Sequence, residues 1–379
     1  MATPRRLLVD PANSGVFHCV SRCVRRAFLC GCDPYSGQDY EHRRAWIRDR
    51  LRQLAGLFAV EVHSYAVMSN HLHLVVRTLP GLAGGWSDEE TARRWLWPFP
   101  GKGGQPGLAP AEAAVRALCE DAEKLATCRA RLADLSWFMR SLNEPIARRA
   151  NREDACTGRF WEGRFKCQKL DDAGAVLACM AYVDLNPVRA GIAATPEESD
   201  FTSVQDRAAA CMARRQLARA PQEPTPPQAQ LIARARAESS RDHWLAPIGA
   251  PRQSPGETGP GTPGEPARAG SGQPAPRPMP AGPPPLLAHM SEERYFELLD
   301  WTGRQIRDGK RGQLAPHLRP ALERLELDVE AWVDNVERYG GLFHRLAGKL
   351  GRLKELARST GVAWLHGNSG ARRLYARAG

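Results

Sequence analysis

The pattern of hydrophobic and polar positions divides the N-terminal part of the chain into alternating strand and helix segments. Short runs rich in β-branched and aromatic residues predict strands, whereas apolar residues repeating every three or four positions predict helices. Strands are expected over 15–21, 60–68, 71–77 and 165–170, and helices over 40–58, 110–131, 132–146 and 173–185. This order predicts an α+β fold with one antiparallel sheet covered by helices.

Local signals refine this prediction. The polar pair Ser69–Asn70 between two strand-like runs predicts a hairpin, and the Gly-, Trp- and Pro-rich stretch 81–107 predicts a loop-like insertion. Pro145 is expected to kink or restart its helix. Asp171 and Asp172 are expected to cap the helix over 173–185.

A change in composition separates the two ends of the chain. Residues 247–285 include 13 Pro and 8 Gly, and such a segment buries too little apolar surface to offset its ordering entropy. We therefore predict a disordered Pro/Gly/Ala-rich linker over 208–285, whose first part, to about residue 246, is rich in Ala, Arg and Gln and compatible with some helix. It follows a folded domain over 13–207 and precedes a helical C-terminal accessory region over 286–379.

Composition and charge narrow the functional class. The chain has 379 residues, 53 Lys plus Arg against 42 Asp plus Glu, and a formal charge of +11. Its ten cysteines are too sparse for a disulfide scaffold. We expect a cytoplasmic protein with no membrane partner, because no secretory signal and no run of about 18 apolar residues is seen. The charge favours a polyanionic partner, or merely a basic surface.

Two histidines stand two positions apart on a predicted strand. His71 and His73 would project from the same face, close enough to share a divalent ion, while Leu72 and Leu74 face the core. Such pairs also occur by chance on half-exposed strands. The pair is therefore a candidate metal site and no more.

A tyrosine and an asparagine are spaced by four residues near the end of the predicted helix over 173–185. Tyr182 and Asn186 would lie on one helical face, one turn apart, before Pro187 ends the helix. Packing in the core is the commoner role of a tyrosine. Beside a metal ion, however, its hydroxyl can attack a phosphodiester and form a covalent phosphotyrosine.

Three segments in this order resemble a known family: SYAVMSNHLHLVVR, GRFWEGRFKCQKL and ACMAYVDLNPVRAGI. They resemble the single-tyrosine transposases of bacterial insertion sequences with a His-hydrophobic-His motif, and more closely the REP-associated tyrosine transposases. The resemblance covers roughly residues 13–207. It implies a ferredoxin-like sheet and a protein that cuts and joins single-stranded or hairpin DNA, bound to the bacterial nucleoid in the cytoplasm.

The resemblance also implies roles for individual residues. His71 and His73 match the family's metal ligands for Mg²⁺ or Mn²⁺, and Tyr182 matches its nucleophile. Asn186 stands where the family has its third, polar ligand. Insertion-sequence members often have Gln there, so Asn186 fits the REP-associated branch and puts mobility of the gene in doubt.

Basic and aromatic residues around these motifs predict a DNA-binding groove. Cations bind phosphates and aromatic faces stack on bases, although ordinary packing and solvation explain such residues equally well. The candidate DNA-binding residues are Arg22, Arg25, Arg26, Arg159, Trp161, Arg164, Lys166 and Arg189.

Other features leave alternatives open. Cys19, Cys23, Cys30 and Cys32 have a spacing unlike standard zinc motifs, so we expect no zinc but note four nearby thiols. His18 and His63 are expected to be structural. The C-terminal region serves either in DNA binding or in packing and dimerisation, which leaves a homodimer open.

Three functions therefore compete. The first is metal-dependent cleavage and transfer of single-stranded DNA through a phosphotyrosine, in transposition or in processing of palindromic repeats. The second is a non-catalytic regulator that binds repeat DNA. The third is a metallo-phosphohydrolase in which Tyr182 is structural. The intact tyrosine and histidine pair favour the first.

The linker gives a prediction that needs no DNA. Limited proteolysis should cut within 247–285 first, because an unfolded segment enters a protease site easily. The cleavage sites can be mapped by mass spectrometry of the fragments. Protection of this segment, with cutting elsewhere, would show that the boundary is misplaced.

Overall fold

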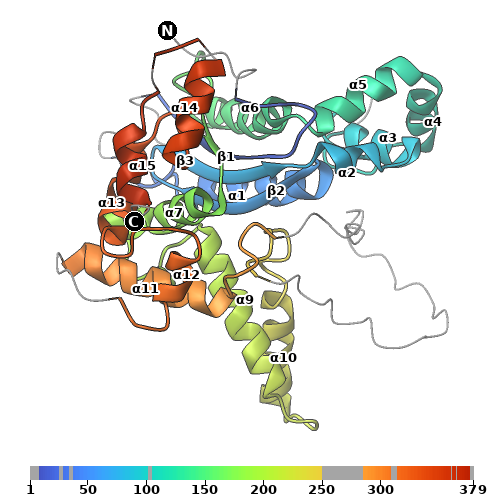
Figure 1. Ribbon diagram of the computed structural model, residues 1–379. Coiled ribbons are helices and arrows are strands. Elements are labelled where there is room, and N and C mark those ends of the chain that lie inside the picture. Colours follow the sequence, from blue (N-terminus) through green and yellow to red (C-terminus); the bar gives the residue numbers. More distant parts are fainter. Residues whose placement is uncertain are drawn as a thin grey trace.

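The computed structural model describes residues 8–24, 29–33, 37–100, 105–249, 285–308, 314–359, 361–363 and 365–375. As predicted, the fold is α+β, with one sheet covered by helices (Figure 1). The strands are β1 (Gly15–Arg22), β2 (Val60–Val67), β3 (His71–Thr78), β4 (Lys166–Leu170) and β5 (Leu346–Ala347). Their order in the sheet is β2-β3-β1-β4-β5.

The first four strands have the ferredoxin-like arrangement. β1 pairs antiparallel with both β3 and β4, and β2 pairs antiparallel with β3. β5 is an addition from the C-terminal region and runs parallel to β4. The backbone N–H of Asp171 donates to the carbonyl of Ala347 at 2.9 Å beside this pairing. The C-terminal region is therefore mainly helical but contributes a strand as well.

The two faces of the sheet carry different cores. On β3, Leu72, Leu74 and Val76 belong to the cluster with α1 (His42–Leu57) and α6 (Leu135–Glu153). Val75 belongs to the opposite cluster, with α7 (Ala173–Asp184). Because side chains alternate along a strand, His71 and His73 project on the α7 face.

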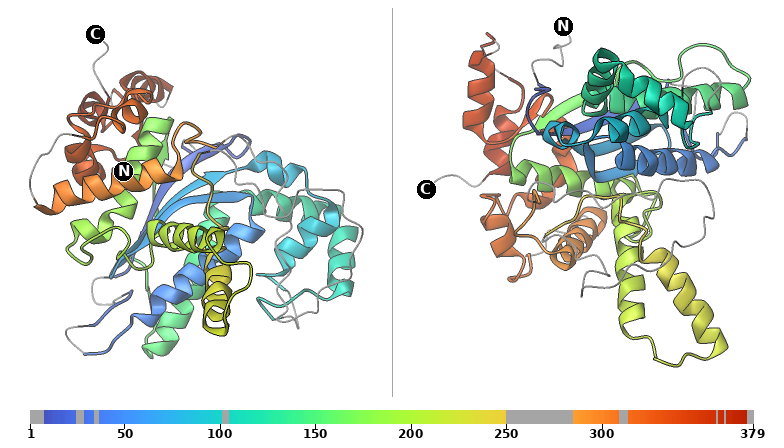
Figure 2. Two further views of the ribbon diagram at one scale, coloured as in Figure 1. Left: turned by 90° about the horizontal axis from the view of Figure 1, so that it is seen from below. Right: turned by 90° about the vertical axis from the view of Figure 1, so that its right-hand side faces the viewer.

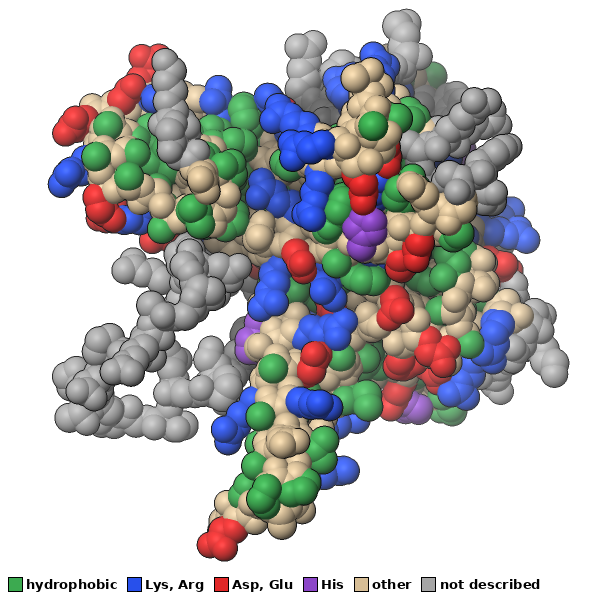
Figure 3. Space-filling view, turned by 180° about the vertical axis from the view of Figure 1, so that it is seen from behind, with side chains coloured by type: hydrophobic (Ala, Val, Ile, Leu, Met, Phe, Trp, Pro, Cys, Tyr) green, Lys and Arg blue, Asp and Glu red, His purple; other side chains and the backbone are tan. Residues whose placement is uncertain are grey.

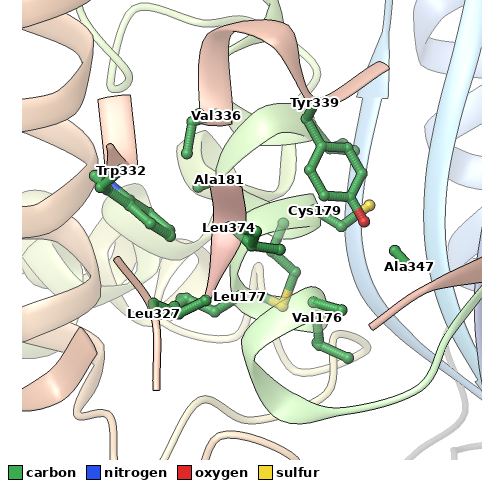
Figure 4. Close-up of a cluster of buried hydrophobic side chains, with 14 of the residues drawn as sticks. Val176, Leu177, Cys179, Ala181, Leu327, Trp332, Val336, Tyr339, Ala347 and Leu374 are labelled. Carbon is green, nitrogen blue, oxygen red and sulfur yellow. The ribbon is translucent and has the colours of Figure 1, made fainter. Parts of the chain in front are cut away.

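α7 is apolar on every side. Ten of its 12 residues are buried, which is typical of a helix enclosed within a protein. It begins as predicted, because the Asp172 side chain accepts a hydrogen bond from the N–H of Ala175 at 2.9 Å. Figure 4 shows α7 side chains such as Leu177 and Cys179 among Trp332, Tyr339 and Leu374 of the C-terminal region.

The C-terminal region shares this core. Its helices lie beside α7 at one end of the sheet (Figures 1 and 2). They are α11 (Glu292–Asp308), α12 (Arg319–Glu323), α13 (Trp332–Leu342), α14 (Leu350–Ser359) and α15 (Asn368–Leu374). The physical reason is α7 itself, whose second apolar face needs a cover.

Part of the predicted linker is folded. Residues 208–249 include most of α9 (Ser203–Ala218) and all of α10 (Pro226–Glu238), which project together from the body (Figure 2). Their Ala, Arg and Gln residues favour helix, and Thr225 with Gln228 forms a capping box at the start of α10. The disorder prediction for 250–284 lies outside the described residues.

The predicted loop-like insertion also contains helices. Within it lie most of α2 (Pro80–Gly84) and all of α3 (Asp88–Leu96), where Ser87 accepts from the N–H of Glu90 at 3.1 Å. The single helix expected over 110–131 is divided into α4 (Glu112–Glu120) and α5 (Ala122–Leu132). α6 continues through Pro145. In the described part of the chain, no helix is both long and apolar enough to cross a membrane.

One buried carboxylate joins three parts of the fold. Asp184, the last residue of α7, accepts hydrogen bonds from Ser64 of β2 at 3.1 Å, from Ser203 of α9, and from the Tyr295 hydroxyl of α11 at 2.6 Å. Burial raises the pKa of Asp184, while these donors and the nearby Arg207 lower it. The C-terminal region is thus tied to the sheet through α7.

Replacing Asp184 with Ala should lower the free energy of unfolding by about 3 kcal/mol, because three buried hydroxyls lose their acceptor. Urea denaturation measures this change. Asp49→Ala on α1 is the control, since its side chain is 62% exposed and should change stability by less than about 0.5 kcal/mol. Equal stability of the two variants would contradict this role of Asp184.

Candidate active site

The register of the sheet gathers the predicted site residues on its α7 face. Val20 of β1 pairs with His73 of β3 on one side and with Lys166 of β4 on the other. Arg22 pairs with His71. Since directly opposed residues point to the same face, these side chains share one surface.

A cavity of about 130 Å³ opens at this surface. Tyr182 of α7 lines it together with both histidines, so the structure brings the predicted nucleophile and the predicted metal ligands together. The complete lining is Val20, Arg22, His71, His73, Glu162, Gly163, Arg164, Lys166 and Tyr182. The ring centroids of His71 and His73 are 4.7 Å apart, and those of His73 and Tyr182 are 5.5 Å apart.

Hydrogen bonds hold both histidines from their Nδ1 side. His71 Nδ1 lies 2.6 Å from the side-chain oxygen of Asn70, and His73 Nδ1 lies 2.9 Å from Nε2 of His18. His73 Nε2 is buried with no hydrogen-bond partner. Proton placement on Nδ1 of each ring would leave both Nε2 lone pairs for a ligand.

Desolvation keeps these imidazoles neutral. Burial lowers the pKa of His71 to about 4 and that of His18 to about 4, and it lowers the pKa of His73 well below its usual value. Nearby cations, including Arg22, lower the pKa values of His71 and His73 further. Neutral imidazole is the form that binds a metal ion.

The donor atoms fit a divalent ion in part. Two imidazole side chains line the cavity, which suits a metal site with open positions. However, no group of three or more His, Cys, Asp or Glu side chains in the described residues is arranged to hold a metal. An ion here would rest on His71 and His73, with further ligands from elsewhere.

Asn186 lies just beyond the end of α7. α7 ends at Asp184, and Asn186 begins the short helix α8 (Asn186–Arg189) after Leu185. It does not line the cavity. Its side chain is buried, and its Nδ2 has no hydrogen-bond partner. Its role as third ligand stays a prediction.

The predicted DNA-binding residues fall into groups. Arg22, Arg164 and Lys166 are exposed at the cavity. Arg159 is exposed, while Trp161 is half-buried and donates to the Asn143 carbonyl at 2.9 Å. Arg25 and Arg26 lie outside the described residues. Figure 3 shows that Lys and Arg side chains gather in the middle of one face of the molecule and at the base of the α9–α10 projection.

Arg189 points inward instead of toward solvent. Its guanidinium carbon lies 4.6 Å from the centroid of the Tyr182 ring, and Nη2 donates to the Glu337 carbonyl of α13 at 2.5 Å. This arrangement supports the tyrosine directly. A role of Arg189 in DNA contact stays a prediction.

Two further residues escaped sequence reasoning. His18 was interpreted as structural, and in the structure it lies within hydrogen-bond distance of His73. Because His18 is two residues before Val20 on β1, both project to the same face of the sheet, and this alternation was the signal in the sequence. Glu162 is the cavity's carboxylate among three cations, and it lies within the GRFWEGRF segment that the motif already marked. A larger cavity of about 370 Å³ is lined by residues of 331–342 and by Arg373. It lacks the pairing of a nucleophile with imidazoles.

Comparisons with known proteins give little beyond this geometry. No protein-family description matches the chain, and no curated protein matches it. A solved structure of a REP-associated tyrosine transposase bound to a REP hairpin is similar, with 14% sequence identity and a TM-score of 0.32. The match covers 55% of this chain and 86% of that one. So distant a likeness does not place the chain in a family.

The exposed cations at the cavity give a prediction about binding. The double variant Arg164→Ala/Lys166→Ala should bind a fluorescein-labelled single-stranded oligonucleotide about 10-fold more weakly at moderate salt. The slope of log K against log salt should fall by about 1.4, because two phosphate contacts are lost. Fluorescence anisotropy across a salt series measures both quantities.

A matched control removes two charges elsewhere. Arg93 of α3 and Arg116 of α4 lie on helices at the opposite end of the molecule from α13 (Figure 1). Arg93→Ala/Arg116→Ala should leave the salt slope nearly unchanged. An equal loss in both double variants would mean that binding follows net charge and not the cavity.

Proposed function

We propose that this protein cleaves and rejoins single-stranded DNA, or the extruded part of a DNA hairpin, through a covalent bond to Tyr182. The observation that carries the proposal is the meeting of Tyr182, His71 and His73 in one cavity with a basic rim. These residues come from β3 and α7, which are far apart in the sequence. The same three residues lie within the segments that resemble the transposase family.

The chemistry balances without an external energy source. The Tyr182 oxygen attacks phosphorus, the bond from phosphorus to the 3′ oxygen breaks, and a 5′-phosphotyrosine and a free 3′-hydroxyl remain. The phenol proton leaves to solvent, and the 3′ oxygen takes one up. Attack by a 3′-hydroxyl on the phosphotyrosine reverses these steps and joins strands. The phosphodiester bond energy is thus retained.

His71 and His73 are the residues that would hold a divalent ion, Mg²⁺ or Mn²⁺. When bound, such an ion supplies Lewis-acid stabilisation of charge on the scissile phosphate and the departing oxygen. The protein itself fixes the two rings through Asn70 and His18 and keeps them unprotonated by burial. Asn186 remains a candidate for a further ligand.

The rim of the cavity suits a polyanion. Arg22, Arg164 and Lys166 are exposed where a phosphate backbone would enter, against the single carboxylate of Glu162. Cations at a rim remain hydrated before binding and release counterions from DNA on contact. A cavity of about 130 Å³ suits a phosphate on a single or extruded strand.

Tyr182→Phe tests the nucleophile. The substrates are hairpin oligonucleotides copied from palindromic DNA that flanks the gene, incubated with Mg²⁺ or Mn²⁺. The parent protein should cut them and form an adduct that survives denaturing electrophoresis. The Phe variant should bind the oligonucleotides equally well yet show neither cleavage nor adduct, because only the hydroxyl is removed.

His71→Ala and chelation by EDTA provide the second arm. Both should stop cleavage, and the Ala variant should also lose binding of Mn²⁺ measured by calorimetry. Cutting by the Phe variant at the parent rate would favour the metallo-phosphohydrolase. Tight binding by the parent without any cutting would favour the DNA-binding regulator.

A further inference from the structure

Two adjacent glycines occupy the last turn of α13. Gly340 and Gly341 are both exposed, and neither has a positive φ. A glycine inside a helix costs about 0.5–1 kcal/mol relative to alanine. Backbone conformation therefore does not explain why glycine stands at either position.

The space beside the two glycines differs sharply. A Cβ atom at Gly340 would lie 2.8 Å from the hydroxyl oxygen of Tyr182 and 3.3 Å from its Cζ. A Cβ atom at Gly341 would meet nothing within 4 Å. At position 340, therefore, the missing side chain leaves the room that the Tyr182 hydroxyl occupies.

Other contacts show that α13 packs around Tyr182. The Tyr339 ring centroid lies 5.5 Å from that of Tyr182. The Glu337 carbonyl holds Arg189, whose guanidinium covers the Tyr182 ring. The rings of His18 and His73 meet the same ring edge-on, at 6.0 Å and 5.5 Å.

We propose that Gly340 is a positioning residue for the Tyr182 hydroxyl, and that α13 makes the C-terminal region a working part of the site. The proposal rests on the proposed function of Tyr182 as nucleophile. The sequence alone led us to describe residues 286–379 as accessory. Because α13 lies beside the phenol oxygen, the C-terminal region helps to set the place from which that oxygen attacks.

The test compares Gly340→Ala with Gly341→Ala in the full-length protein. Single-turnover cleavage of the hairpin oligonucleotide is measured at saturating protein, and affinity is measured separately by anisotropy. Gly340→Ala should lower the cleavage rate about 100-fold, the size of effect expected when a reacting group is displaced by about 1 Å. Its affinity for the oligonucleotide should match that of the parent. Gly341→Ala should cleave like the parent.

A double-mutant cycle with Tyr182→Phe, measured by melting temperature, isolates the contact with the hydroxyl. In the parent background, Gly340→Ala should melt at a lower temperature than Gly341→Ala. In the Phe background this difference should shrink, because the atom nearest to the new methyl is gone. A difference that stays the same in both backgrounds would place the cost of Gly340→Ala away from the hydroxyl and overturn the proposal.

The failures of the two proposals are distinguishable. Equal cleavage by Gly340→Ala and Gly341→Ala, with an active parent that needs Tyr182, overturns the positioning role alone. No cleavage by the parent overturns the proposed function and the positioning role together. A fall in affinity that accounts for the whole loss of cleavage assigns Gly340 to DNA binding and overturns its role in positioning.

Discussion

Helix α7 has apolar side chains all round because the sheet covers one of its faces and the C-terminal helices cover the other. Only at its end does it carry polar groups that need partners. Asp184 receives three hydroxyl donors from β2, α9 and α11, so its burial is compatible with a charged or a shared-proton state. The last turn of α7 therefore carries two polar side chains. Asp184 is hydrogen-bonded to β2, α9 and α11, and Tyr182 lines the cavity. A fold built in this way cannot release its C-terminal region without exposing α7.

Elements with strong local patterns could be predicted from the sequence. Alternation on β3 separated Leu72 and Leu74 from the histidines, and Asp172 was recognised as the cap of α7. Local signals were also overlooked, since Ser87 and Glu90 have the spacing of a capping box at the start of α3. What local patterns could not give was long-range packing. Nothing near residue 182 shows that α13 will cover it. The site role of Asn186, which lies beyond the end of α7, stays a prediction.

The electrostatics of the cavity divide into an inner and an outer part. The histidines are desolvated, so their pKa values are lowered and their imidazoles remain uncharged. The cations Arg22, Arg164 and Lys166 stay at the exposed rim, where charge costs little. The opposite arrangement, with the cations inside and the histidines at the rim, would bury the guanidinium groups and leave the histidines open to protonation. A phosphate entering the cavity would thus pass cations first and meet neutral imidazoles and a phenol last, an order that suits the handling of an anion.

Gly340 shows how a departure from a local rule can locate function. Glycine weakens the last turn of α13, and the two positions 340 and 341 are alike in exposure and backbone conformation. They differ only in what lies beside them, and at 340 that neighbour is the oxygen proposed to attack phosphorus. Sequences that fold well have local preferences that agree with the overall structure, and exceptions concentrate where a site needs room or strain. On this argument the weak turn of α13 leaves space for the Tyr182 hydroxyl, while the Tyr182 ring lies beside those of His18 and His73.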